Sequence, residues 1–417
     1  MEKLLIEGGH QLKGEVNISG MKNSALPILY ACLLIEEECI IHNVPRVSDI
    51  VNTLTILQGL GVTAEFIDHN VVKINAKNAC PIIKNQDLVS KMRASSYLMG
   101  SLLSRFNEVS INMPGGCNFG VRPIDEHLKG FQKLGANCIE DDGKIHIKAT
   151  KLLKNQKITL DKISVGATIN MVLASVQIEG STIIENCAIE PHVDDLIHFL
   201  NKCGAKIIRN GRTIYINGVN TLNGTSYSIF PDMIESLTYA CFVGVVGGSI
   251  TLNLVNLEHL QYSLNILKSM GIEVKEYESS VVLSRKNELI GVNIATAPYP
   301  FFPTDLHPQL SSLLCFTKNG GSVRDDIFPT RFAYIDELKK MGASIEKSNN
   351  SAIVKPSKLF GTKIDATDLR AGASLITASL GASGVSEINN VNYIVRGYES
   401  LVDKITSIGG KIKLVNN

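Results

Sequence analysis

The stretch that decides the fold runs from Gly166 to Ile216, GATINMVLASVQIEGSTIIENCAIEPHVDDLIHFLNKCGAKIIRNGRTIYI. Its first part, 166–174, consists of small and apolar residues and predicts a helix. The β-branched run 181–186 predicts a strand. Residues 194–200 predict an amphipathic second helix, and Gly204 follows it as a C-cap because glycine readily takes a positive φ.

A hairpin completes this stretch. Lys206–Ile208 and Thr213–Ile216 predict two strands joined by the turn 209–212. We therefore predict a unit of the βαβαββ type. The glycine anchor of this unit recurs about every 70 residues, in six copies. The anchors are Leu60-Gly61-Val62, Leu134-Gly135-Ala136, Cys203-Gly204-Ala205, Met270-Gly271-Ile272, Met341-Gly342-Ala343 and Ile408-Gly409-Gly410.

The length of the unit predicts how the copies assemble. A 70-residue unit is far longer than a solenoid repeat, so three copies are expected to close into one compact domain. We expect a first domain over 22–229 and a second over 1–21 plus 230–417. The crossing point is expected at Ser228-Ile229-Phe230-Pro231, and the opening strand is expected to pair with the second group of repeats.

Composition excludes several classes of protein. Hydrophobic residues make up 44% and charged residues 19% of the 417 residues, and the formal net charge is +1, so no basic field for nucleic acid is expected. The nine cysteines are scattered without a C-x-x-C pair, which argues against a disulfide framework or a zinc site and favours a reducing cytoplasm. The uncharged run 236–257 is interrupted by Gly247-Gly248, so we expect a helix, a turn and a strand rather than a membrane span.

A glycine- and proline-rich segment, Met113–Pro123, predicts a loop. It carries Cys117 with Arg122 five residues later, an electropositive setting that favours thiolate chemistry. A surface loop with an incidental cysteine is the alternative, and the loop alone does not decide between them.

Cationic residues recur at equivalent junctions of the repeats. Each of them alone is typical of a solvent-exposed surface, but together they predict recognition of a small, multiply charged anion. They are Lys22, Arg93, Arg122, Arg331, Arg370 and Arg396. The rigid segment Pro298–Asp305 presents Asp305 as a candidate base, and the alternative is that Asp305 caps the helix that follows.

These motifs together resemble the UDP-N-acetylglucosamine 1-carboxyvinyltransferase family of enolpyruvyl transferases. The resemblance covers essentially the whole chain, in order. It rests on ISGMKNSALPIL (18–29), MPGGCNFGVRPID (113–125), KISVGAT (162–168), APYPFFPTD (297–305), Arg331, DLRAGAS (368–374) and RGYE (396–399). The resemblance implies a two-domain inside-out α/β barrel with three βαβαββ units in each domain.

The resemblance also implies a reaction in peptidoglycan precursor synthesis. The enolpyruvyl group of phosphoenolpyruvate would pass to the 3′-hydroxyl of UDP-N-acetylglucosamine, with release of phosphate and without metal or organic cofactor. The implied catalytic residues are Cys117 as proton donor and the target of fosfomycin, Asp305 as base, Lys22 and Arg396. Phosphoenolpyruvate would contact Lys22, Asn23, Arg122, Arg331, Arg370 and Arg396. UDP-N-acetylglucosamine would contact Asn23, Arg93, Arg122, Pro123, Ile124, Asp125, Glu126, Lys162, Ile163, Ser164, Val165, Asp305 and Ile327.

Two alternatives stay open. Phe301 and Thr330 depart from the family pattern near Asp305, which would fit a paralogous enolpyruvyl transferase with another acceptor. The Cys117 loop and the KISVGAT segment argue against the sister chemistry on shikimate phosphate. The sixfold repetition alone is equally compatible with a non-catalytic repeat-ring binding protein. Both substrates of the implied reaction are small molecules, and no nucleic acid, membrane or obligate protein partner is expected.

Overall fold

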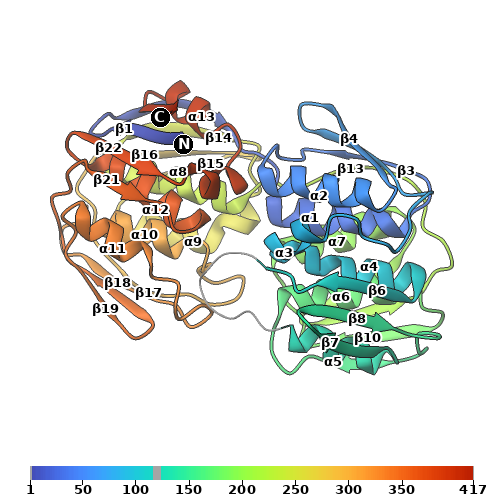
Figure 1. Cartoon of the computed structure of the whole chain (residues 1–417). Coiled ribbons are helices and arrows are strands. Elements are labelled where there is room, and N and C mark those ends of the chain that lie inside the picture. The colour runs from blue at the N-terminus through green and yellow to red at the C-terminus, as the bar shows by residue number, and fades with distance from the viewer. Residues whose placement is uncertain (1, 116–123, 417) are drawn as a thin grey trace. The chain divides into compact units, whose positions relative to one another are not determined.

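The structure, a computed structural model, describes residues 2–115 and 124–416. The described residues form two compact units (Figure 1). The first unit lies between Gly20 and Phe230, and the second holds residues 2–19 together with those from Pro231 onward. Cys117, Arg122 and Pro123 lie outside the described residues.

In the first unit, helices and strands alternate. Its helices are α1 (Lys22–Ala31), η1 (Cys32–Leu34), α2 (Ser48–Gly59), α3 (Gln86–Lys91), η2 (Arg93–Ser96), α4 (Tyr97–Phe106), α5 (Asp125–Lys133), α6 (Val165–Ser175) and α7 (Pro191–Lys202). Its strands are β3 (Glu38–His42), β4 (Thr63–Asp68), β5 (Val71–Asn75), β6 (Glu108–Asn112), β7 (Asn137–Asp141), β8 (Lys144–Lys148), β9 (Lys157–Thr159), β10 (Ser181–Glu185), β11 (Lys206–Asn210), β12 (Thr213–Asn217) and β13 (Ser226–Ser228).

The second unit repeats the alternation. Its helices are α8 (Met233–Val246), α9 (Leu257–Met270), α10 (His307–Leu314), α11 (Tyr334–Lys340), α12 (Leu369–Gly381), η3 (Val391–Arg396) and α13 (Leu401–Ser407). Its strands are β1 (Glu2–Glu7), β2 (Leu12–Asn17), β14 (Gly248–Asn253), β15 (Glu273–Glu276), β16 (Ser280–Arg285), β17 (Asn293–Ala295), β18 (Gly321–Arg324), β19 (Ile345–Ser348), β20 (Ser351–Val354), β21 (Lys363–Asp365), β22 (Val385–Asn389) and β23 (Lys411–Asn416).

Each unit carries three small sheets. Those of the first unit have the strand orders β13-β3-β5-β4, β6-β8-β7 and β11-β12-β10-β9, and those of the second have β15-β16-β14-β2, β17-β18-β20-β19 and β21-β22-β1-β23. Every four-stranded sheet combines one parallel pair, such as β9 with β10, with two antiparallel pairs. Among the described strands no sheet closes into a barrel.

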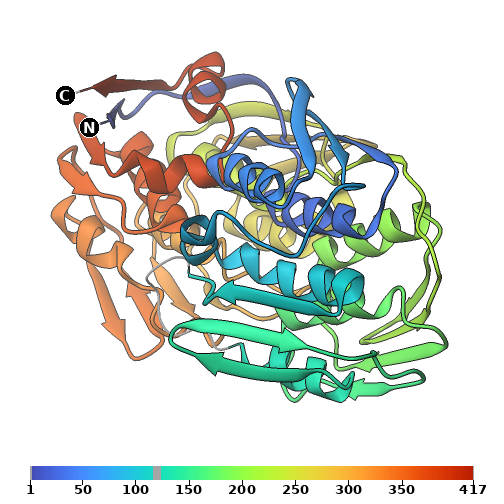
Figure 2. The ribbon, with the colours of Figure 1, turned by 45° about the vertical axis from the view of Figure 1, so that its right-hand side comes forward.

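Largely buried helices, such as α6 in the first unit and α8 and α12 in the second, form the interior, and the sheets lie on the outside. In α8 every residue from Ile234 to Val246 is buried, and α12 packs against both α8 and α10 (Figures 1 and 2). A helix that is apolar all round belongs in a core. In contrast β12 alternates buried and exposed residues, as expected of a sheet with one face toward the core. The predicted inside-out α/β architecture is confirmed in this sense.

The anchor glycines behave as predicted. All six, from Gly61 to Gly409, have φ between 84° and 106°, a conformation that L-residues with a Cβ rarely adopt. The helix predicted at 194–200 is longer than expected. It begins at Pro191, because proline has no N–H to satisfy and its fixed φ suits the first helical position.

The opening strands both pair within the second unit. β1 lies between β22 and β23 and is antiparallel to each, so the expected pairing with the second group of repeats is confirmed. β2 runs parallel to β14. The two ends of the described chain therefore meet in one sheet.

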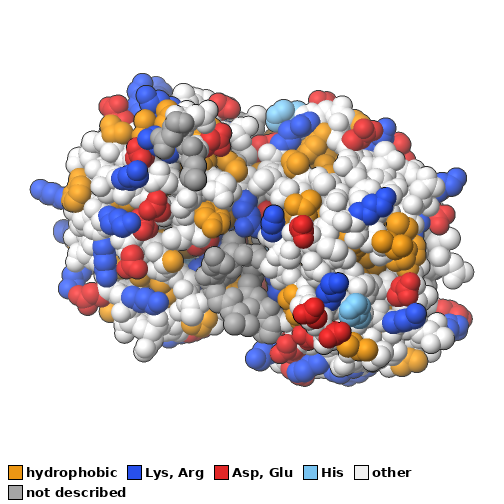
Figure 3. Space-filling view, viewed as in Figure 1, with side chains coloured by type: hydrophobic (Ala, Val, Ile, Leu, Met, Phe, Trp, Pro, Cys, Tyr) orange, Lys and Arg blue, Asp and Glu red, His pale blue; other side chains and the backbone are white. Residues whose placement is uncertain are grey.

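The uncharged run 236–257 forms the predicted helix, turn and strand. α8 ends at Val246, Gly247 and Gly248 both have positive φ, and β14 follows. Among residues 2–115 and 124–416, no helix combines the length and apolar character that crossing a membrane requires. On the face shown in Figure 3, basic and acidic side chains are interspersed over each unit, in keeping with the near-neutral net charge.

Candidate active site

The start of α12 fixes the position of Arg370. Asp368 Oδ1 accepts hydrogen bonds from the backbone N–H groups of Arg370 and Ala371 at 2.9 and 3.1 Å, which makes Asp368 the N-cap. Arg370 therefore lies in the first turn, and its side chain is only 4% exposed. A buried guanidinium requires acceptors close by.

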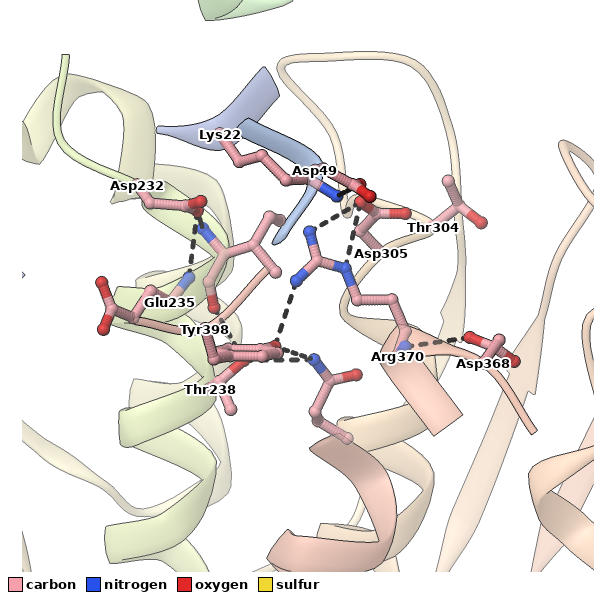
Figure 4. A network of polar contacts seen from close by, with 12 residues as sticks. Lys22, Asp49, Asp232, Glu235, Thr238, Thr304, Asp305, Asp368, Arg370 and Tyr398 are labelled. Atoms are coloured by element: carbon pink, nitrogen blue, oxygen red, sulfur yellow. Dashed lines mark hydrogen bonds and ion pairs between the residues drawn. The ribbon is translucent and has the colours of Figure 1, made fainter. Parts of the chain in front are cut away.

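Asp305 is the main acceptor for Arg370. Its Oδ2 accepts hydrogen bonds from Nε and Nη2 of Arg370 at 3.2 and 3.0 Å (Figure 4). Its Oδ1 accepts a hydrogen bond from Nη1 of Arg331 at 2.7 Å. Burial alone would raise the pKa of Asp305, but the charges of Arg370 and Arg331 hold that pKa well below its usual range. The N-cap of α10 is Leu306, so the alternative role of Asp305 as a helix cap is not what the structure shows.

The other edge of the Arg370 guanidinium is also held. Nη1 donates to the hydroxyl of Tyr398 at 3.1 Å, and that hydroxyl lies 3.0 Å from Thr238 Oγ1 and 3.2 Å from Gln309 Nε2 (Figure 4). The guanidinium is thus fixed in its plane between Asp305 and Tyr398. Such preorganisation orients positive charge without further cost when an anion binds.

Arg331 lies beside a pocket of about 300 Å³ in the second unit. Its Nη1 lies 3.4 Å from both the carbonyl oxygen and Oγ1 of Thr304, the residue before Asp305. The pocket is lined by Thr330, Arg331, Ala333, Ala366, Thr367, Asp368, Asn390 and Tyr393. Arg396 ends η3, and Ile327 lies in the loop after β18.

In the first unit, Lys22 begins α1. Its Nζ donates to Asp49 Oδ2 at 3.0 Å, and Asp49 lies in the first turn of α2. Met21 precedes α1 without a side-chain cap, and Asn23 follows Lys22 in the first helical turn. A lysine at the positive end of a helix dipole suits an anionic ligand.

Arg93 begins η2 in the same unit, and its charge acts on His127. Burial is the larger cause and the Arg93 charge the smaller, and together they lower the pKa of His127 to about 3. Nδ1 of this ring lies 2.8 Å from Nδ2 of Asn170. Oδ1 of Asn170 in turn accepts a hydrogen bond from the N–H of Gly100 at 2.8 Å. His127 is therefore neutral at pH 7.

Two predicted acceptor-binding segments meet in the first unit. Oε2 of Glu126 accepts the backbone N–H groups of Asp161 and Lys162 at 2.8 and 3.3 Å. Ser164 then caps α6 by accepting the N–H of Ala167 at 3.2 Å. The residues 124–126 at the start of α5 are thereby joined to the segment 162–165.

The structure thus brings together Asp305, Arg331 and Arg370 in one unit, and Glu126 with Lys162 in the other. Several residues that hold these groups were missed by the sequence analysis. They are Asp49, Thr238, Gln309, Asp325, Asp368 and Tyr398. Tyr398 and Asp368 lay inside quoted motifs, but nothing in the sequence marked Asp49 or Asp325 as partners.

No group of three or more His, Cys, Asp or Glu side chains able to hold a metal ion occurs within the part of the chain that the structure describes. The described residues place two fixed cations, Arg331 and Arg370, around the carboxylate of Asp305. This arrangement can bind an anion and move a proton.

Comparison with known proteins identifies close relatives. A family model described as EPSP synthase (3-phosphoshikimate 1-carboxyvinyltransferase) matches residues 6–405. The UDP-N-acetylglucosamine 1-carboxyvinyltransferase of Halothermothrix orenii is 43% identical over 416 residues, with 100% of both chains covered. A protein named UDP-N-acetylglucosamine 1-carboxyvinyltransferase 3 from Caldanaerobacter subterraneus subsp. tengcongensis is 44% identical, with 99% of each chain covered.

Solved structures support the fold. The enolpyruvyl transferase NikO from Streptomyces tendae aligns with a TM-score of 0.90 at 23% identity, covering 99% of this chain and 98% of that one. EPSP synthase from Acinetobacter baumannii aligns with a TM-score of 0.80 at 18% identity over 100% of both chains. At these identities the likeness concerns the architecture alone.

Proposed function

The chain belongs to the EPSP synthase family of carboxyvinyltransferases, and we propose that it transfers the enolpyruvyl group of phosphoenolpyruvate to the 3′-hydroxyl of UDP-N-acetylglucosamine, releasing phosphate. It is a transferase. The observation that carries the choice of acceptor is the full-length identity of 43% to a relative named for UDP-N-acetylglucosamine. Such a reaction supplies a precursor of peptidoglycan.

The donor phosphoenolpyruvate carries a carboxylate and a phosphate. The buried guanidinium groups of Arg331 and Arg370 suit the carboxylate, because a planar fork matches its two oxygens. Lys22 and Arg396, with Arg122 and Asn23, are proposed for the phosphate end. Cys117 is proposed to deliver a proton to the methylene carbon of phosphoenolpyruvate. Both Cys117 and Arg122 lie outside the described residues.

Asp305 is proposed as the base that takes the proton of the acceptor hydroxyl. A carboxylate held by Arg331 and Arg370 has a pKa well below its usual range and is a weak base. A substrate carboxylate that draws either guanidinium away would raise the pKa of Asp305. Donor binding would thereby activate the base, and proton transfer would wait until the donor is in place.

UDP-N-acetylglucosamine is proposed to bind through segments that the structure organises locally. In the first unit these are Asn23, Arg93, the 124–126 segment and the 162–165 segment, and in the second unit Ile327. The contact of Glu126 with Asp161 and Lys162 supports this choice, because it holds both segments in one arrangement. We further propose that the enzyme acts in the cytoplasm, without a cofactor and without an obligate protein partner.

The decisive experiment measures phosphate release from phosphoenolpyruvate with either UDP-N-acetylglucosamine or shikimate 3-phosphate as acceptor. We expect release with the UDP-sugar and none with shikimate 3-phosphate. Release with shikimate 3-phosphate alone would assign the chain to the sister chemistry. Absence of release with both acceptors would favour a binding protein over an enzyme.

Peptide mapping tests the proposed role of Cys117 separately. Incubation with fosfomycin and UDP-N-acetylglucosamine should modify Cys117 and none of the other eight cysteines. Of those eight, Cys32, Cys39, Cys187, Cys203, Cys241 and Cys315 are buried, so they serve as internal controls. An adduct on any cysteine other than Cys117 would remove Cys117 from the mechanism.

A further inference from the structure

Asp325, immediately after β18, is a carboxylate with no exposed surface. Its Oδ1 accepts three hydrogen bonds, from Thr296 Oγ1 at 2.7 Å and from the backbone N–H groups of Ile327 and Phe328 at 2.9 and 3.1 Å. These bonds close the loop that leads to Arg331. A buried charge is tolerated only where donors surround it in this way.

The second oxygen of Asp325 faces the loop that carries Asp305. Oδ2 accepts the hydroxyl of Thr304 at 2.6 Å and lies 3.2 Å from Nε2 of His307. The donors on this carboxylate outweigh the effect of burial and lower the pKa of Asp325 to about 2. Asp325 thus stays ionised at neutral pH and holds residues on both sides of Asp305.

His307 supports this arrangement from the first turn of α10. Its side chain has no exposed surface, and its ring centroid lies 5.1 Å from that of Phe332 and 5.6 Å from that of Tyr334. His307 Nδ1 lies 3.4 Å from the Tyr334 hydroxyl. Packing against Phe332 and Tyr334 restrains the ring in its position beside Asp325.

Thr304 connects this buried network to the candidate base. Its hydroxyl points to Asp325, while its carbonyl and Oγ1 both lie 3.4 Å from Nη1 of Arg331. The same Nη1 donates to Asp305 at 2.7 Å. A rotation of Thr304 would therefore change the position of Asp305 and of the guanidinium that controls it.

We propose that Asp325 is a positioning residue for the transfer reaction: through the hydroxyl of Thr304 it fixes the orientation of Asp305 relative to Arg331. Asp325 contacts neither of the groups proposed to react, and it acts only through Thr304 and the loop of Ile327. This inference rests on the proposed function, since Asp305 has its role there.

The two threonines that donate to Asp325 provide a matched pair of variants. Thr304→Val removes the hydroxyl on the Asp305 side, and Thr296→Val removes an equivalent hydroxyl from the other oxygen. Thr304→Val removes the 2.6 Å hydrogen bond to Asp325 together with the longer 3.4 Å contact to Arg331. We expect kcat to fall about tenfold, with KM for both substrates within about threefold. For Thr296→Val we expect kcat within about twofold of wild type, and Thr304→Ser should restore most of the lost kcat.

Equal losses of kcat in both valine variants would overturn the proposal, because a merely structural role would not distinguish the two oxygens. If wild-type protein shows no turnover, the proposed function fails, and crystal structures of the same variants then test the positioning role on its own. We expect Asp305 Oδ1 to leave Arg331 in Thr304→Val and to stay bonded in Thr296→Val. An unmoved Asp305 in Thr304→Val would also overturn the proposal.

Discussion

In the second unit, the cations of the candidate site are two guanidinium groups that are about 5% exposed and converge on one carboxylate, Asp305. In the first unit, the ammonium of Lys22 is 12% exposed and contacts Asp49, which is 8% exposed. The guanidiniums are fixed in direction by several acceptors, whereas the lysine is a point charge on a flexible stem. The difference indicates that the second unit sets geometry and the first unit supplies adjustable charge.

The same contrast holds for the buried histidines. His127 of the first unit has no carboxylate among the causes of its pKa shift and faces the charge of Arg93. His307 of the second unit lies beside Asp325, which opposes the lowering of its pKa by burial. The buried histidine of the second unit therefore has a carboxylate partner, which favours one rigid arrangement around it.

The largest effect is expected from Asp305→Asn. The amide cannot accept a proton and leaves Arg331 and Arg370 without their shared anion, so kcat should fall roughly 10²- to 10⁴-fold, the usual contribution of a general base. Phosphate release at saturating substrates measures it. Near-normal turnover would show that the guanidinium pair, and not the carboxylate, is the functional element of the second unit.

The next effect is on stability and concerns His127. Its folded pKa of about 3 lies below the unfolded value of about 6.5, so the folded state favours the neutral ring. The contribution of His127 to the free energy of unfolding is fully present above pH 6.5. It decreases as the pH falls toward 3, by about 1.4 kcal/mol for each pH unit.

Urea unfolding between pH 7 and 4 tests this expectation. His127→Gln should flatten the acid limb relative to wild type, and His307→Gln should flatten it less because Asp325 opposes the shift. Equal flattening by the two variants would contradict the contrast between the units.

A smaller effect is expected from replacing the guanidiniums by lysine. Arg370 bridges Asp305 and Tyr398, so Arg370→Lys loses several directed bonds and should raise KM for phosphoenolpyruvate about tenfold. Arg331→Lys can still place an ammonium near Asp305 and should raise it less. Steady-state kinetics with varied phosphoenolpyruvate decide the order. A larger effect at Arg331 would show that Arg331, and not Arg370, contributes more to binding of phosphoenolpyruvate.

The smallest effect is expected from Asp49→Asn in the first unit. The amide keeps an oxygen that can accept from Lys22, so exchange of the ion pair for a neutral hydrogen bond should cost about 1 kcal/mol and change KM for phosphoenolpyruvate less than about threefold. Thermal unfolding and kinetics measure the two values. A tenfold change in KM would show that Asp49 aims Lys22 as strictly as Asp305 aims the arginines.

Short stretches of the sequence were sufficient to predict much of the architecture. The six anchor glycines predicted the repeat because a positive φ is a property of a single residue, and all six adopt it. The third repeat was predicted element by element because periodicity and turn residues act over a few positions. The boundaries shifted where a local rule was overlooked, as at Pro191.

Which charged side chains form ion pairs was decided by the tertiary structure. Arg370 and Asp305 are 65 residues apart, and Lys22 and Asp49 are 27 apart, so no local pattern connects them. The sequence analysis proposed the cations of the site and the carboxylate of Asp305 as separate groups. It did not show that Arg331 and Arg370 already hold that carboxylate and lower its pKa.

By itself the sequence determined the repeated unit, the helical and strand segments and the family, because these follow from short-range periodicity and from motifs. Only the tertiary structure decided which carboxylate neutralises which cation and that Asp325 joins the loops of Thr304 and Ile327. The physical reason is that desolvation and charge pairing depend on distances of a few ångströms between distant segments, and these distances exist only after the helices have packed.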